Sequence, residues 1–336
     1  LGMFIIPSTN PSSWAILAAS GSFLSLLGAL KSSGKTVLAL SALTVVFTFL
    51  GAGARGDQAI YDIFGLVAAL ILGFQKNKRF AKFTFFATIL SLVNFLFFIT
   101  TSQSSVVESG LIDGQQASNM STLNLIFANL LEMPKLWVGI FGSWGLGWLD
   151  TPVPSVVWVA GLSAFVALIF TSLRQISKSK LIVVFSIIAA IWVIPTYVLV
   201  KTHAIVGAYV QPRYLLPLIV LLAAVVLSQQ GTSRIQLGRV QALIVVLTLA
   251  VANSLSLHFN LSRYLHGTDK PGWNLDSGIE WWWNLPTSPM TVWVVGSVSF
   301  LMLLTLSAQL ISPKDAEGNS FGVAWLLPTK KLVSGL

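Results

Sequence analysis

The chain has 336 residues, of which 55% are hydrophobic and only 9% are charged, and its formal net charge is +9. Soluble domains carry about 25% charged residues, so this composition excludes a water-soluble globular protein. Cysteine is absent, which excludes disulfide bonds, thiol catalysis and cysteine-bound metals.

Apolar stretches of nearly 20 residues recur along the whole chain, and an α-helix needs about that length to cross a bilayer. Most of them are apolar on every face, as lipid-embedded helices are. We therefore predict an all-α, polytopic transmembrane bundle that forms one domain over residues 1–336. The nine expected spans are residues 14–30, 36–52, 58–74, 80–100, 155–173, 181–200, 214–229, 240–257 and 290–311.

The loops between these spans alternate in charge, and this alternation predicts the topology. One set of loops holds 14 of the 20 lysines and arginines with two acidic residues, and the other holds six basic and nine acidic residues. Because cytoplasmic loops are enriched in Lys and Arg, the first set, with net charge +12, is expected inside and the second, with −3, outside. This places residue 1 outside and the tail at about 312–336 in the cytoplasm. The basic residues follow the topology and do not form one clustered face, so no nucleic-acid partner is expected.

The first residue is Leu1, and an outward N-terminus without a leader is unusual. We therefore expect further residues upstream, including at least one more span.

Two long outer loops, at about 101–154 and 258–289, are candidates for a functional role, because long connections without regular structure often carry function. Semi-apolar stretches within them, at 123–149 and 273–285, are expected to form short interfacial or re-entrant helices. Eight of the 12 tryptophans lie in these loops or just after them, Trp281 and Trp282 among them. One interpretation is an aromatic belt at the headgroup level, and the other is a wall for a sugar or lipid substrate.

Several outer polar residues are candidates for a site. Arg213 follows Gln211-Pro212 at the mouth of a span, where it is either a bidentate phosphate ligand or a snorkelling anchor. Arg55 and Asp57 lie just before another span, with Asp62 one turn deeper. Acidic residues beside or within spans often mark functional sites, whereas an Arg55–Asp57 pair could equally close a tight turn.

Other outer candidates are carboxylates in apolar surroundings and a short basic segment after one span. Glu132 and Asp150 suit general-base chemistry if burial raises their pKa, and a cap or turn role is the alternative. His258, Arg263 and His266 follow residues 240–257, but their spacing does not favour a His-based metal site.

Six segments in order carry a family resemblance: Asn10-Pro-Ser-Ser-Trp14, Arg55-Gly-Asp57, Gly145-Leu-Gly-Trp-Leu-Asp-Thr-Pro152, Val210-Gln-Pro-Arg-Tyr-Leu-Leu-Pro217, His258-Phe-Asn-Leu-Ser-Arg-Tyr264 and Trp281-Trp-Trp283. Together they resemble the DUF2142 family of predicted bacterial membrane proteins, especially its actinobacterial members. That family is similar in architecture to the GT-C class of integral membrane glycosyltransferases.

The resemblance implies a polyprenyl-phosphate sugar donor, a bacterial plasma membrane and an extracytoplasmic active site. In GT-C enzymes the catalytic acidic residue usually lies in the first outer loop, which here is expected upstream of Leu1. Arg213, Tyr214, Asn10, Arg55 and Asp57 match family motif positions. The resemblance leaves a divalent metal, Mg²⁺ or Mn²⁺, open as a cofactor.

The leading hypothesis is therefore glycosyl transfer from a lipid-linked sugar during cell-envelope polysaccharide or glycolipid assembly. Arg213, with Arg55, would neutralise the lipid phosphate, and Asp57 or an upstream carboxylate would act as the base. Membrane lipids and the lipid-linked sugar are the expected partners. The alternatives are a transporter or flippase for lipid-linked glycans, which the scarcity of ionisable groups in the spans disfavours, and a structural subunit beside other membrane proteins.

Overall fold

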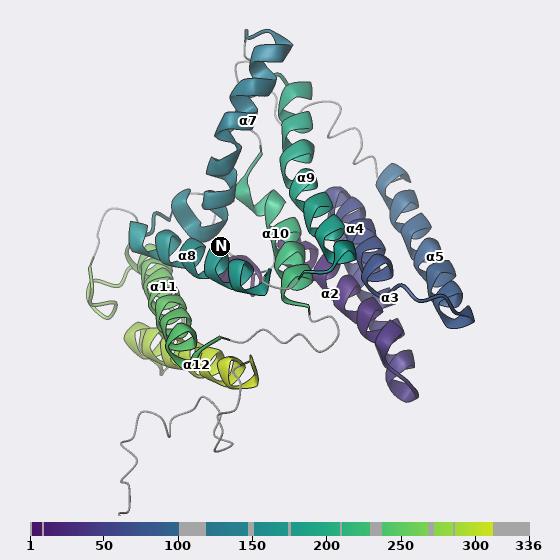
Figure 1. Ribbon diagram of the computed structural model, residues 1–336. Coiled ribbons are helices and arrows are strands. Elements are labelled where there is room, and N and C mark those ends of the chain that lie inside the picture. The colour runs from purple at the N-terminus through teal and green to yellow at the C-terminus, as the bar shows by residue number, and fades with distance from the viewer. Residues whose placement is uncertain are drawn as a thin grey trace, which may run out of the picture. The chain divides into compact units, whose positions relative to one another are not determined.

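The computed structural model describes residues 2–8, 10–100, 119–146, 151–173, 176–208, 210–228, 237–267, 272–284 and 286–311. All regular elements within these ranges are helices, which confirms the predicted all-α fold (Figure 1). In chain order they are α1 (Gly2–Ile5), α2 (Pro11–Lys31), α3 (Lys35–Ala54), α4 (Gly56–Leu72), α5 (Lys78–Thr100), α7 (Thr122–Val138), the π-helix η1 (Gly139–Ser143), α8 (Ser155–Ser172), α9 (Lys178–Lys201), α10 (Pro212–Leu227), α11 (Arg239–His266) and α12 (Pro289–Ile311).

Eight of the described helices are long and apolar enough to cross a membrane: α2, α3, α5, α7 with η1, α8, α9, α11 and α12. Each of the nine expected spans falls on a helix. However, α4 and α10 have 17 and 16 residues, slightly fewer than the roughly 20 that a full crossing needs. The chain is a multi-helix membrane protein, but the count of nine spans is not confirmed.

The helix α7 is longer than the short interfacial helix expected in this loop. Ser121 caps its N-terminus by accepting a hydrogen bond from the Asn124 amide, and the helix continues through Pro134 into η1. Its charged residues Glu132 and Lys135 form an ion pair at helical spacing, so they neutralise each other on one face. The pairing makes a small contribution to the helix, because both side chains are exposed.

The described chain divides into two compact units. Unit 1 comprises Leu1–Gly147 and Gln175–Ser228, and unit 2 comprises Trp148–Arg174 and Gln229–Leu336. Unit 1 therefore contains α1–α5, α7, η1, α9 and α10, and unit 2 contains α8, α11 and α12. The expectation of a single domain stays a prediction.

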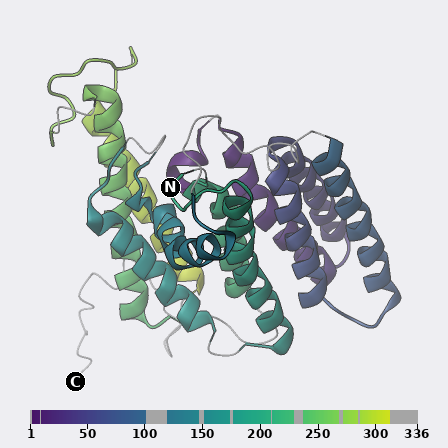
Figure 2. The same cartoon turned by 90° about the horizontal axis from the view of Figure 1, so that it is seen from above.

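The core of unit 1 is built around α2, of which 14 of 21 residues are buried. Figures 1 and 2 show α2–α5 packed side by side, and α2 also contacts α10. Small residues allow this close packing, as they do between membrane helices in general. A Cβ on Gly65 of α4 would lie 2.5 Å from the Ala19 carbonyl oxygen of α2, so these two backbones are nearly in contact.

Unit 1 has a basic end, which brings together the C-terminal ends of α2 and α10 and the N-terminal ends of α5 and α9. Arg79 donates a 2.7 Å hydrogen bond to the Ala29 carbonyl and another to the Ser32 carbonyl. Lys180 donates to the carbonyls of Val226 at 2.6 Å and Ser228 at 2.8 Å. These helix ends are the ones that the charge pattern predicts to be cytoplasmic. The orientation itself stays a prediction.

Unit 2 has a small apolar core and a large apolar surface. Its core joins Ala242 and Val246 of α11 to Ala308 of α12, with Leu168 of α8 packed against them. Apolar side chains of α12 such as Val295 and Leu303 are both 57% exposed. A helix of this composition exposes such a surface to lipid acyl chains, so unit 2 contacts membrane lipids.

Candidate functional site

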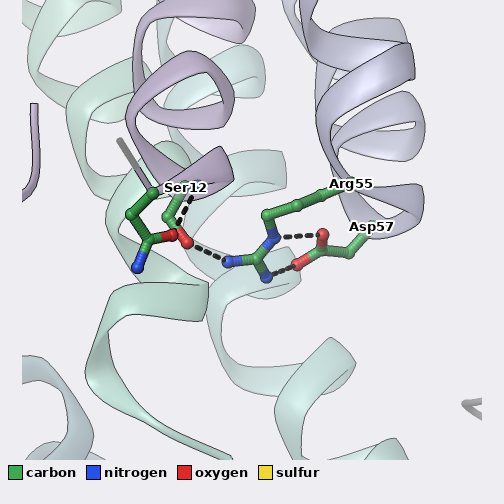
Figure 3. A network of polar contacts seen from close by, with 4 residues as sticks. Ser12, Arg55 and Asp57 are labelled. Atoms are coloured by element: carbon green, nitrogen blue, oxygen red, sulfur yellow. Dashed lines mark hydrogen bonds and ion pairs between the residues drawn. The ribbon is translucent and has the colours of Figure 1, made fainter. Parts of the chain in front are cut away.

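Arg55 is the centre of a polar cluster at the end of unit 1 opposite the basic end. It forms the junction between α3 and α4, in extended conformation with φ −157° and ψ 142°, and it caps both helices. Its Nε donates to Asp57 Oδ1 at 2.9 Å, its Nη2 donates to Asp57 Oδ2, and its Nη1 donates to Ser12 Oγ at 2.9 Å. Figure 3 shows the guanidinium held between these two side chains.

Asn10 fixes the position of Ser12 in this cluster. It caps α2, because its Oδ1 accepts a 2.9 Å hydrogen bond from the Ser12 amide. The Ser13 hydroxyl donates to the Asn10 carbonyl at 2.6 Å, which strengthens the same cap. Asn10 therefore contributes to the cluster by orienting the first turn of α2, with Ser12 as the residue that contacts Arg55.

The first turn of α10 brings a second arginine to the cluster. Gln211 occupies the N-cap position without a side-chain capping bond, and Pro212 begins the helix, so Arg213 and Tyr214 follow within one turn. The Arg55 Cζ lies 4.5 Å from the centroid of the Tyr214 ring, and the Arg213 Cζ lies 5.4 Å from it. Both contacts are within the range of cation–π attraction. We call Ser12, Arg55, Asp57, Arg213 and Tyr214 the arginine cluster.

The cluster carries two guanidinium groups and one carboxylate, and thus an excess of one positive charge. Burial lowers the pKa of Arg55, but the charge of Asp57 and its hydrogen bonds raise it by more, so the net pKa lies above its ordinary value. Arg55 therefore stays protonated at every physiological pH. A partly buried site with a net positive charge and planar donors is suited to an anion such as a phosphate.

Pro212 also connects the cluster to η1. A Cβ on Gly139 of η1 would lie 2.4 Å from the Pro212 Cγ, so only glycine allows this contact. Further along the same segment, Asn129 of α7 donates to the Ala204 carbonyl and accepts from the Val206 amide, both at 2.9 Å. These bonds attach the middle of α7 to the loop after α9. The first half of α7 therefore extends beyond the C-terminal end of α9 (Figure 1).

Glu132 is the remaining sequence candidate in unit 1. Glu132 pairs with Lys135 on α7, and both side chains are largely exposed, at 46% and 66%. The contacts of Glu132 are thus with its own helix. Ser12 and Asn129 were not among the sequence candidates. Ser12 lies inside the quoted Asn10–Trp14 motif, whose cap signal could have identified it, whereas nothing local distinguishes Asn129.

Arg263, Trp281 and Trp282 belong to unit 2. Arg263 lines a cavity of about 240 Å³ together with His258, Phe259, Ser262 and Trp273. The His258 ring contacts Trp273, and its Nε2 lies 3.1 Å from the Trp273 carbonyl oxygen.

The rings of Trp281 and Trp282 each pack edge-on against Trp283, and Trp282 donates to the Thr287 carbonyl. Asp150 lies outside the described residues. Within the described ranges, no group of three or more His, Asp and Glu side chains is arranged to hold a metal ion.

Comparison with known proteins gives one result for the family. No curated protein matches the chain, and no solved structure matches it. Residues 1–222, which include the whole arginine cluster, match the family described as predicted membrane protein (DUF2142). The chain therefore belongs to the DUF2142 family of predicted membrane proteins.

Proposed function

We propose that this protein transfers a sugar from a polyprenyl-phosphate carrier on the extracytoplasmic side of the bacterial plasma membrane, during assembly of a cell-envelope polysaccharide or glycolipid. The main support for the proposal is that Arg55 and Arg213 both make cation–π contacts with the Tyr214 ring. Asp57 is the single carboxylate of this cluster. The class of donor is the one that the resemblance to GT-C glycosyltransferases implies.

In this proposal Arg213 binds the phosphate of the carrier and Arg55 adds charge from a fixed position. All three guanidinium nitrogens of Arg55 are already engaged by Asp57 and Ser12. Arg55 therefore stabilises the negative charge mainly through the field of its guanidinium. Arg213 is the proposed direct ligand, because it lies in the first turn of α10 beside the same Tyr214 ring. Arginine suits this task because its planar donors match phosphate oxygens in pairs.

The transfer step needs a base for the acceptor hydroxyl. The hydroxyl oxygen attacks the anomeric carbon, the bond from that carbon to the phosphate oxygen breaks, and the carrier phosphate leaves with the electron pair. The hydroxyl proton passes to a carboxylate, for which Asp57 is the candidate in the arginine cluster. Both oxygens of Asp57 accept hydrogen bonds from Arg55, so Asp57 acts as the base only if the pair opens when the acceptor binds.

The described residues do not by themselves fit a divalent metal at this cluster. Asp57 is its single carboxylate, and Mg²⁺ requires near-octahedral oxygen coordination. No step of the proposed transfer therefore depends on a metal ion.

The proposal is tested with the full-length protein in membranes, by measuring sugar transfer from polyprenyl-phosphate donors. We expect Arg213→Ala to lower transfer at least tenfold, with partial recovery in Arg213→Lys. Lys135→Gln serves as the control, because Lys135 is exposed and pairs only within its own helix. Absence of transfer by the wild type from every donor tested, or an Arg213→Ala variant with wild-type activity, contradicts the proposal.

A flippase for lipid-linked glycans is the second candidate, and the buried Asp62 favours it. Asp62 and Asn94 are wholly buried and hydrogen-bonded to each other within unit 1. Proteoliposomes distinguish the two functions. A flippase moves the intact lipid-linked glycan between leaflets, whereas the enzyme consumes it.

A further inference from the structure

Four neighbouring helices of unit 1 each place a polar side chain at one buried point. Ser22 of α2, Thr48 of α3, Asp62 of α4 and Asn94 of α5 all have no solvent exposure. Asn94 Nδ2 donates a 2.7 Å hydrogen bond to Asp62 Oδ2, which ties α4 to α5. The hydroxyls of Ser22 and Thr48 lie close enough to the same carboxylate to donate weak hydrogen bonds to it. We call these four residues the Asp62 cluster.

Each member of the Asp62 cluster has one buried oxygen whose bonding is incomplete. Asp62 Oδ1, Asn94 Oδ1, Ser22 Oγ and Thr48 Oγ1 have no hydrogen bond of strict geometry to a described group. Among the described residues, the ion pairs are Arg55–Asp57 and Glu132–Lys135, so none of them neutralises Asp62. A buried carboxylate without a counter-charge is strongly unfavourable, particularly inside a membrane protein.

We propose that the Asp62 cluster binds a dehydrated monovalent cation, Na⁺. A carboxylate, an amide oxygen and two hydroxyls form a set of hard oxygen ligands, and hard cations prefer such ligands. The single negative charge of Asp62 makes a complex with a monovalent ion neutral. A divalent ion would leave one uncompensated positive charge in the low-dielectric interior, which opposes its binding.

The packing around the cluster favours a small ion over a larger one. Gly65, three residues after Asp62, brings α4 almost into contact with the Ala19 carbonyl of α2. Gly51, three residues after Thr48, allows α3 the same close approach to Ala18 of α2. These contacts restrict how far the helices can separate, so Na⁺ fits more readily than K⁺. A proton on Asp62 would add only one donor, whereas the proposed cation would be coordinated by all four oxygens.

On the side of the Asp62 cluster that faces the arginine cluster, the next buried polar side chain has no hydrogen bond. On the opposite side, the next polar side chains are hydrogen-bonded to each other. Gln58 lies one turn before Asp62 on α4, and it is wholly buried with neither amide atom hydrogen-bonded. In the opposite direction, Ser25 and Thr44 bond to each other at 2.9 Å, and Thr44 donates to the Leu40 carbonyl. The ion therefore enters past Gln58, from the end of unit 1 that carries Arg55.

The test measures ion binding by the purified full-length protein in lipid nanodiscs, without any sugar donor. Thermal unfolding is followed by tryptophan fluorescence in NaCl, KCl or choline chloride at constant ionic strength, and ²²Na⁺ binding is measured in parallel. Since a ligand that binds only the folded state raises its stability, we expect Na⁺ to raise the Tm saturably above that in choline, and more than K⁺ does.

Three variants locate the site. Thr48→Val removes one ligand oxygen with little change in volume, and it should weaken ²²Na⁺ binding at least tenfold. Asp62→Asn should abolish the response to Na⁺ and raise the Tm in choline, because it removes the unneutralised charge. Thr44→Val is the matched control, since Thr44 is equally buried one turn away on α3 but its hydroxyl is already bonded. It should keep the wild-type response to Na⁺.

Equal Tm values in NaCl and choline overturn the proposal, and so does wild-type ²²Na⁺ binding by Thr48→Val. A stability that depends on pH but not on Na⁺ also overturns it, because the occupant is then a proton. If Asp62→Asn does not fold, Thr48→Val and ²²Na⁺ binding still decide the outcome. No donor is present, so this result is independent of the proposed transfer reaction.

Discussion

Replacing Asp57 by asparagine removes the charge that faces Arg55 and leaves the shape of the arginine cluster nearly unchanged. Arg55 keeps its hydrogen bond to Ser12 and its stacking on Tyr214. The variant therefore measures the electrostatic coupling at the junction between α3 and α4. Because the Arg55 side chain is only 16% exposed and that of Asp57 is 30% exposed, solvent screens this pair weakly.

The magnitude follows from burial and geometry. Exposed ion pairs contribute about 0–1 kcal/mol, whereas removal of one partner from a fully buried pair costs about 3–5 kcal/mol. The Arg55–Asp57 pair is bidentate and of intermediate burial, so its contribution to stability lies between these limits. We expect a coupling free energy of about 1–2 kcal/mol between Arg55 and Asp57, obtained from the double-mutant cycle of Arg55→Met and Asp57→Asn.

The assay is equilibrium unfolding in mixed detergent micelles, with the four proteins of the cycle compared at one lipid composition. Glu132 and Lys135 provide a matched control pair, because both are exposed and their coupling should stay below about 0.5 kcal/mol. A coupling between Arg55 and Asp57 no larger than that of the control refutes the reasoning. The other contacts of Arg55, with Ser12, Tyr214 and the backbone of Gly51 and Gln58, would then hold the junction.

Two further predictions concern packing and buried hydrogen bonds in unit 1. Gly65→Ala should lower the free energy of unfolding by about 1–3 kcal/mol, because the added Cβ meets a backbone carbonyl oxygen of α2. Gly53→Ala, which meets no atom within 4 Å, should be neutral or slightly stabilising in the same unfolding assay. Equal effects at the two sites contradict the close approach. Asn129→Ala should cost about 1–3 kcal/mol, because it leaves the Ala204 carbonyl and the Val206 amide without their bonds, and faster hydrogen exchange at Val206 would accompany it. An unchanged exchange rate at Val206 would show that the loop after α9 keeps its structure without Asn129.

The sequence predicted the helices well because a bilayer imposes a strong length requirement on apolar segments. Each of the nine expected spans falls on a helix, with bounds that differ by a few residues except at α11, which continues nine residues beyond the expected end at 257. The length of α7 was not predicted, because Glu132, Pro134 and Lys135 interrupt its hydropathy. The ion pair that neutralises its charges becomes visible only once the segment is known to be helical.

The arginine cluster could be predicted in part from the sequence. Arg55 and Asp57 are two residues apart, so their pairing is local and was one of the two interpretations considered. The meeting of Arg55 with Arg213 on one ring depends on the packing of α10 against α2 and α4, which no local pattern encodes. The same holds for Asp62 and Asn94, whose bond joins residues 32 positions apart.

The most direct test of the central claim is the binding of polyprenyl phosphate to the purified full-length protein, with the uncharged polyprenol as the reference lipid. Hydrogen bonds to charged groups contribute about 1.5–3 kcal/mol, and 1.4 kcal/mol corresponds to a factor of ten in affinity. We therefore predict that Arg213→Ala raises the Kd for polyprenyl phosphate by about 10- to 100-fold and leaves the weak binding of polyprenol unchanged. Equal affinity of the wild type for the two lipids, or an unchanged Kd in Arg213→Ala, would contradict the account.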